Sequence, residues 1–183
     1  MKNVTLILLH NNIVNKHGNV VETSITNIDI HDIARTCKTY GITEYAVVTR
    51  LQSQKRLLEE VIDYWVDGKG GKINPDRRLA LEIINHYNDI NAIIEKYENC
   101  SIIITDAKKH DRNISYLDMR NIIKSQKDKH FLLVFGTGWG LDSLITSKSE
   151  YVLEPIEGDS SYNHLSVRAA CAIICDRLFG NNF

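Results

Sequence analysis

Three glycines that follow a strongly apolar run are the first place in the chain to look for ligand chemistry. Gly136, Gly138 and Gly140 stand in the sequence FGTGWGL. Glycine permits positive φ and lets a ligand or another backbone approach without a Cβ in the way. No lysine follows as a phosphate-binding P-loop requires, and the spacing does not fit a dinucleotide fingerprint. The loop is therefore either an ordinary tight turn or a ligand site of another class.

Charged side chains earlier in the chain are candidates for acting on a substrate. Arg35 lies among apolar residues of an expected helix, where it must extend to solvent or find a partner. A structural ion pair is the alternative role. His31, near the start of the same helix, has a pKa suited to proton transfer near neutrality, although capping or packing is the commoner role. The densest cluster of cations comes later, at Lys69, Lys72, Arg77 and Arg78.

Alternating strands and helices are expected to position these groups. Continuous apolar runs predict five buried strands, at Val4–His10, Tyr45–Thr49, Cys100–Thr105, Phe131–Gly136 and Tyr151–Ile156. Helical periodicity predicts helices at about Ile30–Tyr40, Gln52–Val66, 77–87, Ala92–Tyr97, Tyr116–Ser125 and 164–180. Asp76 and Ser115 are candidate helix caps. Strands that alternate with helices predict a three-layer α/β sandwich with a mostly parallel sheet.

The polar segments between these elements have less certain roles. Asn11–Glu22 is expected to be a loop or loose hairpin, and Asp106–Asn113 a loop. Val66–Asp76 contains three glycines. We interpret it as a mobile lid or substrate loop, with a flexible linker as the alternative.

Composition sets bounds on the function. A length of 183 residues suits one domain, and a net charge of −1 provides no overall basic field for nucleic acid. The four cysteines lack C-x-x-C spacing and are expected to be reduced core residues. The seven histidines show no paired ligand spacing, so no metal site is expected. Neither a signal peptide nor a membrane-spanning run is found, which predicts a cytoplasmic protein.

Three stretches in order resemble a known family. TNIDIHDIARTCKTYGI (Thr26–Ile42), FGTGWGL (Phe135–Leu141), and YVLEPI with SYNHLSVRAACAII after it (151–174) are similar to motifs of the SPOUT superfamily of S-adenosylmethionine (SAM)-dependent RNA methyltransferases. The chain looks closest to a small bacterial, single-domain branch, and the resemblance covers about Leu6 to Gly180. It implies a deep trefoil knot in the region of about 131–180, with roughly Leu153–Leu178 threaded through a loop. It also implies a SAM cofactor bent in the knotted loops and a homodimer formed by the knot helices.

The resemblance implies roles for individual residues. The expected catalytic residues are Arg35, Asp29, His31 and Asn163. The expected cofactor-binding residues are Thr105, Asp106, Ala107, Phe135, Gly136, Thr137, Gly138, Ile156, Glu157, Leu165 and Ser166. The expected RNA-binding residues are Lys69, Lys72, Arg77 and Arg168. In the dimer, Arg35 of one subunit is expected near the cofactor of the other.

Several of these residues have a structural alternative. The family motif often carries asparagine six residues before its arginine, and here Asp29 stands there, as a base or hydrogen-bond acceptor. Asn163 and Ser166 could simply cap a helix. Ile156 and Leu165 could pack in the core, and Arg168 could form an ion pair instead of binding RNA phosphate.

The expected function is SAM-dependent methylation of tRNA or rRNA. Because 183 residues leave little room for an appended RNA-binding domain, the catalytic domain must grip the RNA itself. Two other functions remain open: a nucleotide-binding α/β protein that uses the glycine loop for another ligand, and a knotted RNA-binding module without turnover.

Overall fold

A parallel sheet forms the centre of the molecule. The computed structural model describes residues 3–160 and 162–181. Seven strands of this part pair in parallel in the order β5-β4-β1-β8-β6-β9-β7. Their bounds are β1 Val4–Leu9, β4 Glu44–Val48, β5 Ile84–Tyr87, β6 Cys100–Ile104, β7 Asn113–Ile114, β8 His130–Gly136 and β9 Tyr151–Leu153. A separate antiparallel hairpin, β2 (Ile13–Val14) with β3 (Val20–Val21), follows β1, as expected for the Asn11–Glu22 segment.

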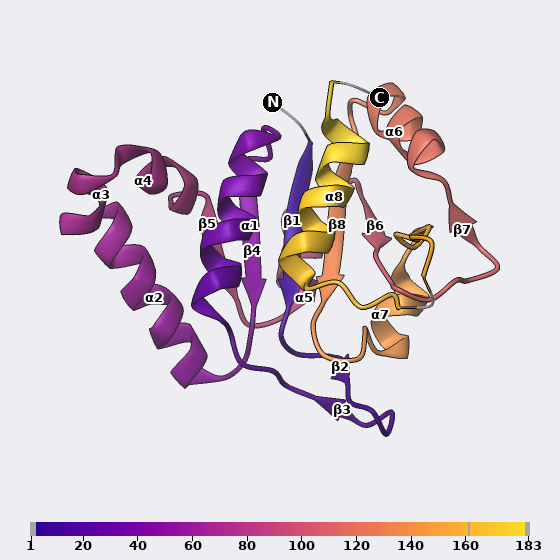
Figure 1. The fold of residues 1–183 in the computed structure, drawn as a ribbon, viewed down its shortest axis with the longest axis horizontal. Helices are drawn as coiled ribbons and strands as arrows, with labels where there is room; N and C mark the ends of the chain where they lie inside the picture. Colours follow the sequence, from indigo (N-terminus) through magenta and orange to yellow (C-terminus); the bar gives the residue numbers. More distant parts are fainter. Residues whose placement is uncertain (1–2, 161, 182–183) are drawn as a thin grey trace.

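Helices cover both faces of the sheet (Figure 1). Their bounds are α1 Asn27–Thr39, α2 Gln52–Val66, α3 Lys69–Ile73, α4 Pro75–Leu81, α5 Ile90–Lys96, α6 Tyr116–Ser125, α7 Ser143–Lys148 and α8 Val167–Phe179. Strand side chains alternate between faces. Leu6 and Leu8 therefore join the core under α1, α6 and α8, whereas Ile7 and Leu9 join the core under α5 and α7. The expected three-layer sandwich is confirmed.

The two strands of the sheet that the sequence did not predict, β5 and β7, lie at its two edges. The expected helix at 77–87 is wrong in its second half, because α4 ends at Leu81 and β5 follows. In β5, Ile84 pairs with Tyr45 and Tyr87 with Val48, so sheet pairing overrides the helical pattern. The cap of α4 is Asn74, whose side chain accepts a hydrogen bond from the Arg77 amide at 2.9 Å, and is not Asp76.

The glycines of Val66–Asp76 serve close packing. A Cβ on Gly70 would lie 2.6 Å from Cε1 of Tyr64, and one on Gly71 would collide with the carbonyl oxygen of Trp65. Only residues without a side chain let α3 approach the end of α2 so closely. The expected loop is therefore wrong, because this segment folds into α3 and the start of α4.

The C-terminal elements differ in their limits from the predicted ones. The last strand ends at Leu153 instead of Ile156, and α8 begins at Val167, where Ser166 accepts a hydrogen bond from the Ala169 amide. The polar segment before that strand contains α7, capped by Asp142. In the sheet, β9 lies between β6 and β7. After it, the Tyr116 hydroxyl donates to the Glu154 carbonyl at 2.9 Å, and the chain returns to pack α8 against α1 and α6.

The cysteines are free thiols, and three of them belong to the core. Cys37, Cys171 and Cys175 are buried between α1 and α8, and Cys100 is half-buried. Burial raises the pKa of the Cys37 thiol well above its usual value. Throughout the described ranges, every helix is too short or too polar to cross a bilayer.

Candidate active site

Three loops meet at one edge of the sheet. Parallel pairing aligns Ile104 with Val134 of β8 on one side and with Val152 of β9 on the other. The loops that leave β6, β8 and β9 therefore start side by side, where open α/β sheets bind ligands. Seven of the expected cofactor-binding residues lie in these loops: Thr105, Asp106, Ala107, Thr137, Gly138, Ile156 and Glu157. Two more, Phe135 and Gly136, end β8.

Hydrogen bonds hold these loops to one another. The Thr105 hydroxyl donates to the Val134 carbonyl at 3.1 Å. The Asn163 amide donates to the Ala107 carbonyl at 2.9 Å, which ties the segment before α8 to the loop after β6. Glu157 forms an ion pair with Lys109 at 3.0 Å. The structure thus brings Asn163 to the expected cofactor loops, with its amide nitrogen bonded to the backbone.

The glycine loop after β8 is shaped by the β2–β3 hairpin. Gly138 and Gly140 have φ of 61° and 113°. A Cβ on Gly138 would lie 2.9 Å from a methyl group of Ile13, so this position requires glycine for both conformation and space. The Thr137 hydroxyl donates to the Leu9 carbonyl at 3.1 Å and contacts the Thr23 hydroxyl at 2.6 Å.

Asp29 and Arg168 form an ion pair between α1 and α8. Arg168 Nη1 lies 3.3 Å from Asp29 Oδ1, and its Nε lies 3.8 Å from Asp32 Oδ2. The Thr26 hydroxyl donates to Asp29 Oδ2 at 2.6 Å and also caps α1. The Asp29 carboxylate is buried. The structure thus joins an expected catalytic residue to an expected RNA-binding residue.

His31 belongs to a second cluster on α1. Its ring contacts Trp65 edge-on at 5.5 Å, and the Arg77 guanidinium lies 4.9 Å from the centre of the Trp65 ring. Burial lowers the pKa of His31, and the positive charges of Arg77 and Arg35 lower it further. These effects favour the neutral imidazole, against the opposite effect of the Asp32 charge. Its Nδ1 is a buried atom with no hydrogen-bond partner among the described residues.

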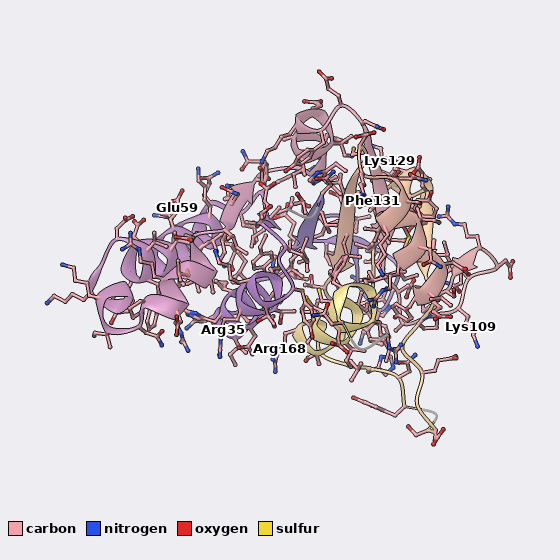
Figure 2. All side chains as sticks on the ribbon, turned by 90° about the horizontal axis from the view of Figure 1, so that it is seen from above. Arg35, Glu59, Lys109, Lys129, Phe131 and Arg168 are labelled. Carbon is pink, nitrogen blue, oxygen red and sulfur yellow. The ribbon has the colours of Figure 1, made fainter. Side chains whose placement is uncertain are left out.

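Arg35 is exposed on α1, one turn after His31 and Asp32. Figure 2 shows Arg35 and Arg168 projecting from α1 and α8, the two helices that pack against each other. Lys69 and Lys72 are exposed on α3, which Figure 1 places on the other side of the molecule from β6 and β9. The expected RNA-binding residues are thus divided between two places. Leu165 and Ser166 are exposed at the start of α8.

Sequence reasoning missed His10. It follows β1 directly, at the point where the strand order reverses between β1 and β8. Its Nδ1 lies 3.0 Å from the Thr23 hydroxyl, and the side chain is buried. The signal that could have found it is a histidine at the end of an apolar run that predicts a strand.

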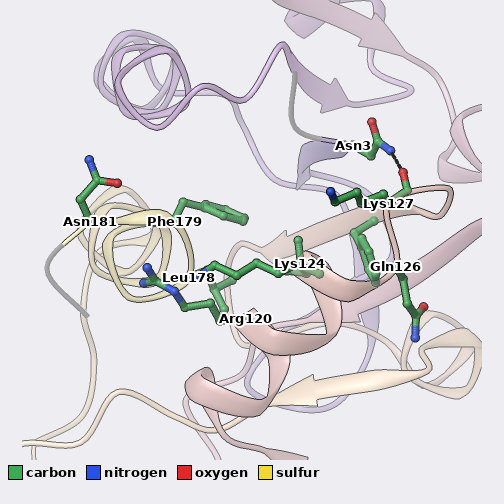
Figure 3. Close-up of a pocket in the computed structure, with 10 residues that line it drawn as sticks. Asn3, Arg120, Lys124, Gln126, Lys127, Leu178, Phe179 and Asn181 are labelled. Atoms are coloured by element: carbon green, nitrogen blue, oxygen red, sulfur yellow. Dashed lines mark hydrogen bonds between the residues drawn. The ribbon is translucent and has the colours of Figure 1, made fainter.

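A cavity of about 520 Å³ lies away from these loops (Figure 3). It opens at the amino ends of β1 and β8, where Asn3 and Phe131 line it together with Arg120 and Phe179 of the helices. The Arg120 guanidinium donates to the carbonyls of Arg177 and Gly180, at 3.3 and 2.6 Å, and so holds the end of α8. In the described part of the chain, no group of three or more His, Cys, Asp or Glu side chains could hold a metal ion.

Comparison with known proteins identifies the family. A family model described as SAM-dependent RNA methyltransferase matches residues 3–180. An uncharacterized protein of Aquifex aeolicus is 37% identical, over 99% of this chain and 90% of its own length. A tRNA (guanine-N(1)-)-methyltransferase of Nitratidesulfovibrio vulgaris is 38% identical, over 98% of this chain. The chain spans only 43% of that relative.

The fold has counterparts among solved structures. A TrmH/SpoU tRNA modifying enzyme from A. aeolicus matches with a TM-score of 0.60 and 15% identity, over 97% of this chain and 74% of its own. At this identity the likeness concerns the fold, and it confirms the SPOUT-like architecture. The family model covers nearly all residues of the chain, which establishes its family. The chain belongs to the family of SAM-dependent RNA methyltransferases.

Proposed function

We propose that this enzyme methylates tRNA or rRNA and binds SAM in the loops after β6, β8 and β9. The adjacency of these three loops, with the Asp29–Arg168 pair on the helices beside the sheet, is the observation that carries the proposal. The name of the N. vulgaris relative supports tRNA as the substrate. Because more than half of that relative lies outside the match, its guanine-N1 activity is not transferred to this chain.

The groups in these loops fit the chemistry of SAM. An adenosine needs apolar walls and backbone hydrogen bonds, which Ile156, Leu165 and the loop backbones can supply. Asp106 and Glu157 offer carboxylates for hydroxyl or ammonium groups. Gly136 and Gly138 leave the backbone accessible without a Cβ. When bound, SAM supplies an activated methyl group on a sulfonium.

The chain's own residues then have to hold and orient the RNA. Alignment of two bound reactants can contribute ~7–11 kcal/mol in favourable cases, so the site needs no nucleophile of its own. We assign Arg35 to the RNA nucleotide, because it is exposed on the helix that carries Asp29 and His31. Asp29, held by Thr26, is an acceptor for a proton or a hydrogen bond. Arg168 and Arg77 contact RNA phosphate, together with Lys69 and Lys72 on α3.

Two features of the superfamily are part of the proposal. The position of β9 between β6 and β7, followed by the return of the chain to α8, supports a trefoil knot made by roughly residues 153–178. Ala170 and Ile173 are half-exposed and lie three positions apart on α8, which supports a homodimer through this helix. The free thiols and an RNA substrate agree with a cytoplasmic location. The proposal treats the chain as one methyltransferase domain.

Two measurements test the proposal. In calorimetric titration, SAM is expected to bind, whereas NAD and ATP are not. Purified protein should then transfer labelled methyl groups from SAM to undermethylated total RNA, and mapping of the modified nucleotide would identify the target. Failure to bind SAM would reject the cofactor site. Binding without transfer to any RNA would favour a binding module without turnover.

A further inference from the structure

One ring nitrogen of His10 has no hydrogen-bond partner among the residues that the structure describes. The residue is 1% exposed and follows β1 directly. Nδ1 lies 3.0 Å from the Thr23 hydroxyl. Nε2 is buried and makes no hydrogen bond with any described residue. Buried polar groups are nearly always hydrogen-bonded, so this atom needs an explanation.

A chain of hydroxyl groups fixes the proton of the imidazole. Thr137 donates to the Leu9 carbonyl at 3.1 Å, because a carbonyl can only accept. Its single proton is then used, so in the 2.6 Å contact Thr137 accepts from Thr23. The proton of Thr23, which also lies 3.4 Å from the His10 carbonyl, is used in turn, so in this arrangement Thr23 accepts from His10 Nδ1. These three bonds form together only when Nδ1 carries the proton.

The free nitrogen is therefore a hydrogen-bond acceptor. Burial lowers the pKa of His10 from 6.5 to about 4, against the opposite effect of the Asp29 charge, so the ring is neutral at pH 7. With its proton on Nδ1, Nε2 presents a lone pair. Asp29 cannot donate to it as a carboxylate. The connection between β3 and α1 that adjoins His10 is irregular, and Glu22, Ser24 and Thr26 in it are exposed.

We propose that His10 is a ligand-binding residue of the methyl-transfer site, whose Nε2 lone pair accepts a hydrogen bond from an N–H or O–H group of a bound ligand once the connection beyond Thr23 shifts. The inference rests on the proposed function. It links the glycine loop, through Thr137 and Thr23, to the start of the helix that carries Asp29 and Arg35. The donor is a group of SAM or of the RNA nucleotide, which offer the same chemistry.

The variant His10→Asn separates the two nitrogens. Its side-chain amide can still donate to Thr23, as Nδ1 does, but it has no acceptor in the place of Nε2. We expect kcat/KM to fall about 10- to 100-fold, the loss of one hydrogen bond to a bound ligand, while the protein stays folded. His17, an exposed histidine in the hairpin region, provides the matched control His17→Asn, for which no change is expected. Parent-like kcat/KM in His10→Asn would overturn the proposal.

Binding measurements locate the donor. If SAM carries it, the calorimetric Kd of His10→Asn for SAM rises and the KM for RNA stays constant. If the RNA carries it, the KM for RNA or kcat changes while the Kd for SAM is kept. A folded variant with lower kcat/KM supports the proposal in either case.

Nitrogen NMR of the histidine rings provides a test without turnover. In the free protein at pH 7, His10 should show a protonated Nδ1 and an unprotonated Nε2, and Thr23→Val should mix the two tautomers. Addition of S-adenosylhomocysteine, or of RNA, should shift the Nε2 resonance. A protonated Nε2 in the free protein, or no shift with either ligand, would overturn the proposal. Absence of SAM binding in the parent protein would instead count against the proposed function.

Discussion

Arg168 and Asp29 are 139 positions apart in the sequence, yet the Arg168 guanidinium lies 3.3 Å from the Asp29 carboxylate. The pair joins α1 to α8, and so connects the first motif of the chain to its last. Asp29 is nearly buried, whereas the Arg168 side chain is 39% exposed. An arginine that is both paired and partly accessible can hold the two helices together and still reach a phosphate.

The strength of this pair can be measured with a double-mutant cycle. Arg168→Gln should destabilise the protein, because it leaves the buried Asp29 carboxylate without its cation. Since the arginine is partly exposed, we expect a coupling energy of only about 1 kcal/mol in the cycle with Asp29→Asn. Urea unfolding of the two single variants and the double variant gives this value. Additive effects would mean that the pair contributes nothing to stability, and RNA binding would then be the one proposed role of Arg168.

Most elements were predictable because their patterns are local. Val4–His10 is a continuous apolar run and became β1, and the periodic apolar positions of 52–66 became α2 with the same limits. The segment Ile84–Tyr87 has no such signal. It reads INHY, its burial is incomplete, and only pairing with β4 makes it a strand. Register with a distant strand is information that a local pattern does not contain.

The candidate site was predictable only where motifs mark it. The motifs indicated the loops after the strands, and parallel pairing brings those loops together. Their relation to α1 depends on contacts between remote positions. Neither the Asp29–Arg168 pair nor the contact of His10 with Thr23 follows from spacing along the chain. At Gly70 and Gly71 the local pattern misled: their composition is typical of a loop, but the glycines allow close helix packing.

Gly71→Ala tests whether that segment is packed or flexible. A Cβ there meets the Trp65 carbonyl oxygen, which is part of the backbone and cannot turn away. We expect a loss of about 1–3 kcal/mol in the free energy of unfolding, typical of overpacking. Gly158→Ala is the control, because its Cβ would meet nothing within 4 Å. A flexible linker predicts almost no change for Gly71→Ala, because the substitution would restrict the folded and the unfolded chain alike.

His10 should make stability depend on pH in a defined window. Its pKa is about 4 in the folded protein against 6.5 for the free side chain, so the unfolded state binds the proton first. Stability is therefore kept above pH 6.5 and falls by roughly 3 kcal/mol as the pH drops to 4. Urea unfolding of His10→Asn should show a shallower slope between these values. His17→Asn, at an exposed position, should retain the slope of the parent protein; equal slopes for all three would contradict the burial effect.

Glu44 provides a second, more acidic transition. This buried carboxylate would have a raised pKa from desolvation, but hydrogen bonds from Lys96, Tyr87 and Tyr97 outweigh that effect and lower its pKa. Its stabilising contribution is present above the ordinary pKa of 4.5 and is lost as the pH falls through the lower folded value. Lys96→Met should destabilise the protein by about 1–3 kcal/mol at pH 7, because the carboxylate loses its cation. Measured by urea unfolding, this loss should shrink as the pH falls from 4.5 through the lowered pKa of Glu44; a loss that is constant with pH would exclude the ion pair as its cause.

Arg35 separates catalysis from cofactor binding. It is exposed on α1, whereas the loops assigned to SAM follow β6, β8 and β9. Arg35→Ala should therefore lower kcat for methyl transfer about 100-fold, the effect of losing one positioned donor, while the calorimetric Kd for SAM stays constant. Arg35→Lys should recover little, because an ammonium group does not reproduce the planar fork of the guanidinium.

Arg56→Ala on the exposed face of α2 is the matched control and should keep full activity. Full activity of Arg35→Ala would exclude a catalytic role, and a weaker Kd for SAM with unchanged kcat would place Arg35 at the cofactor instead.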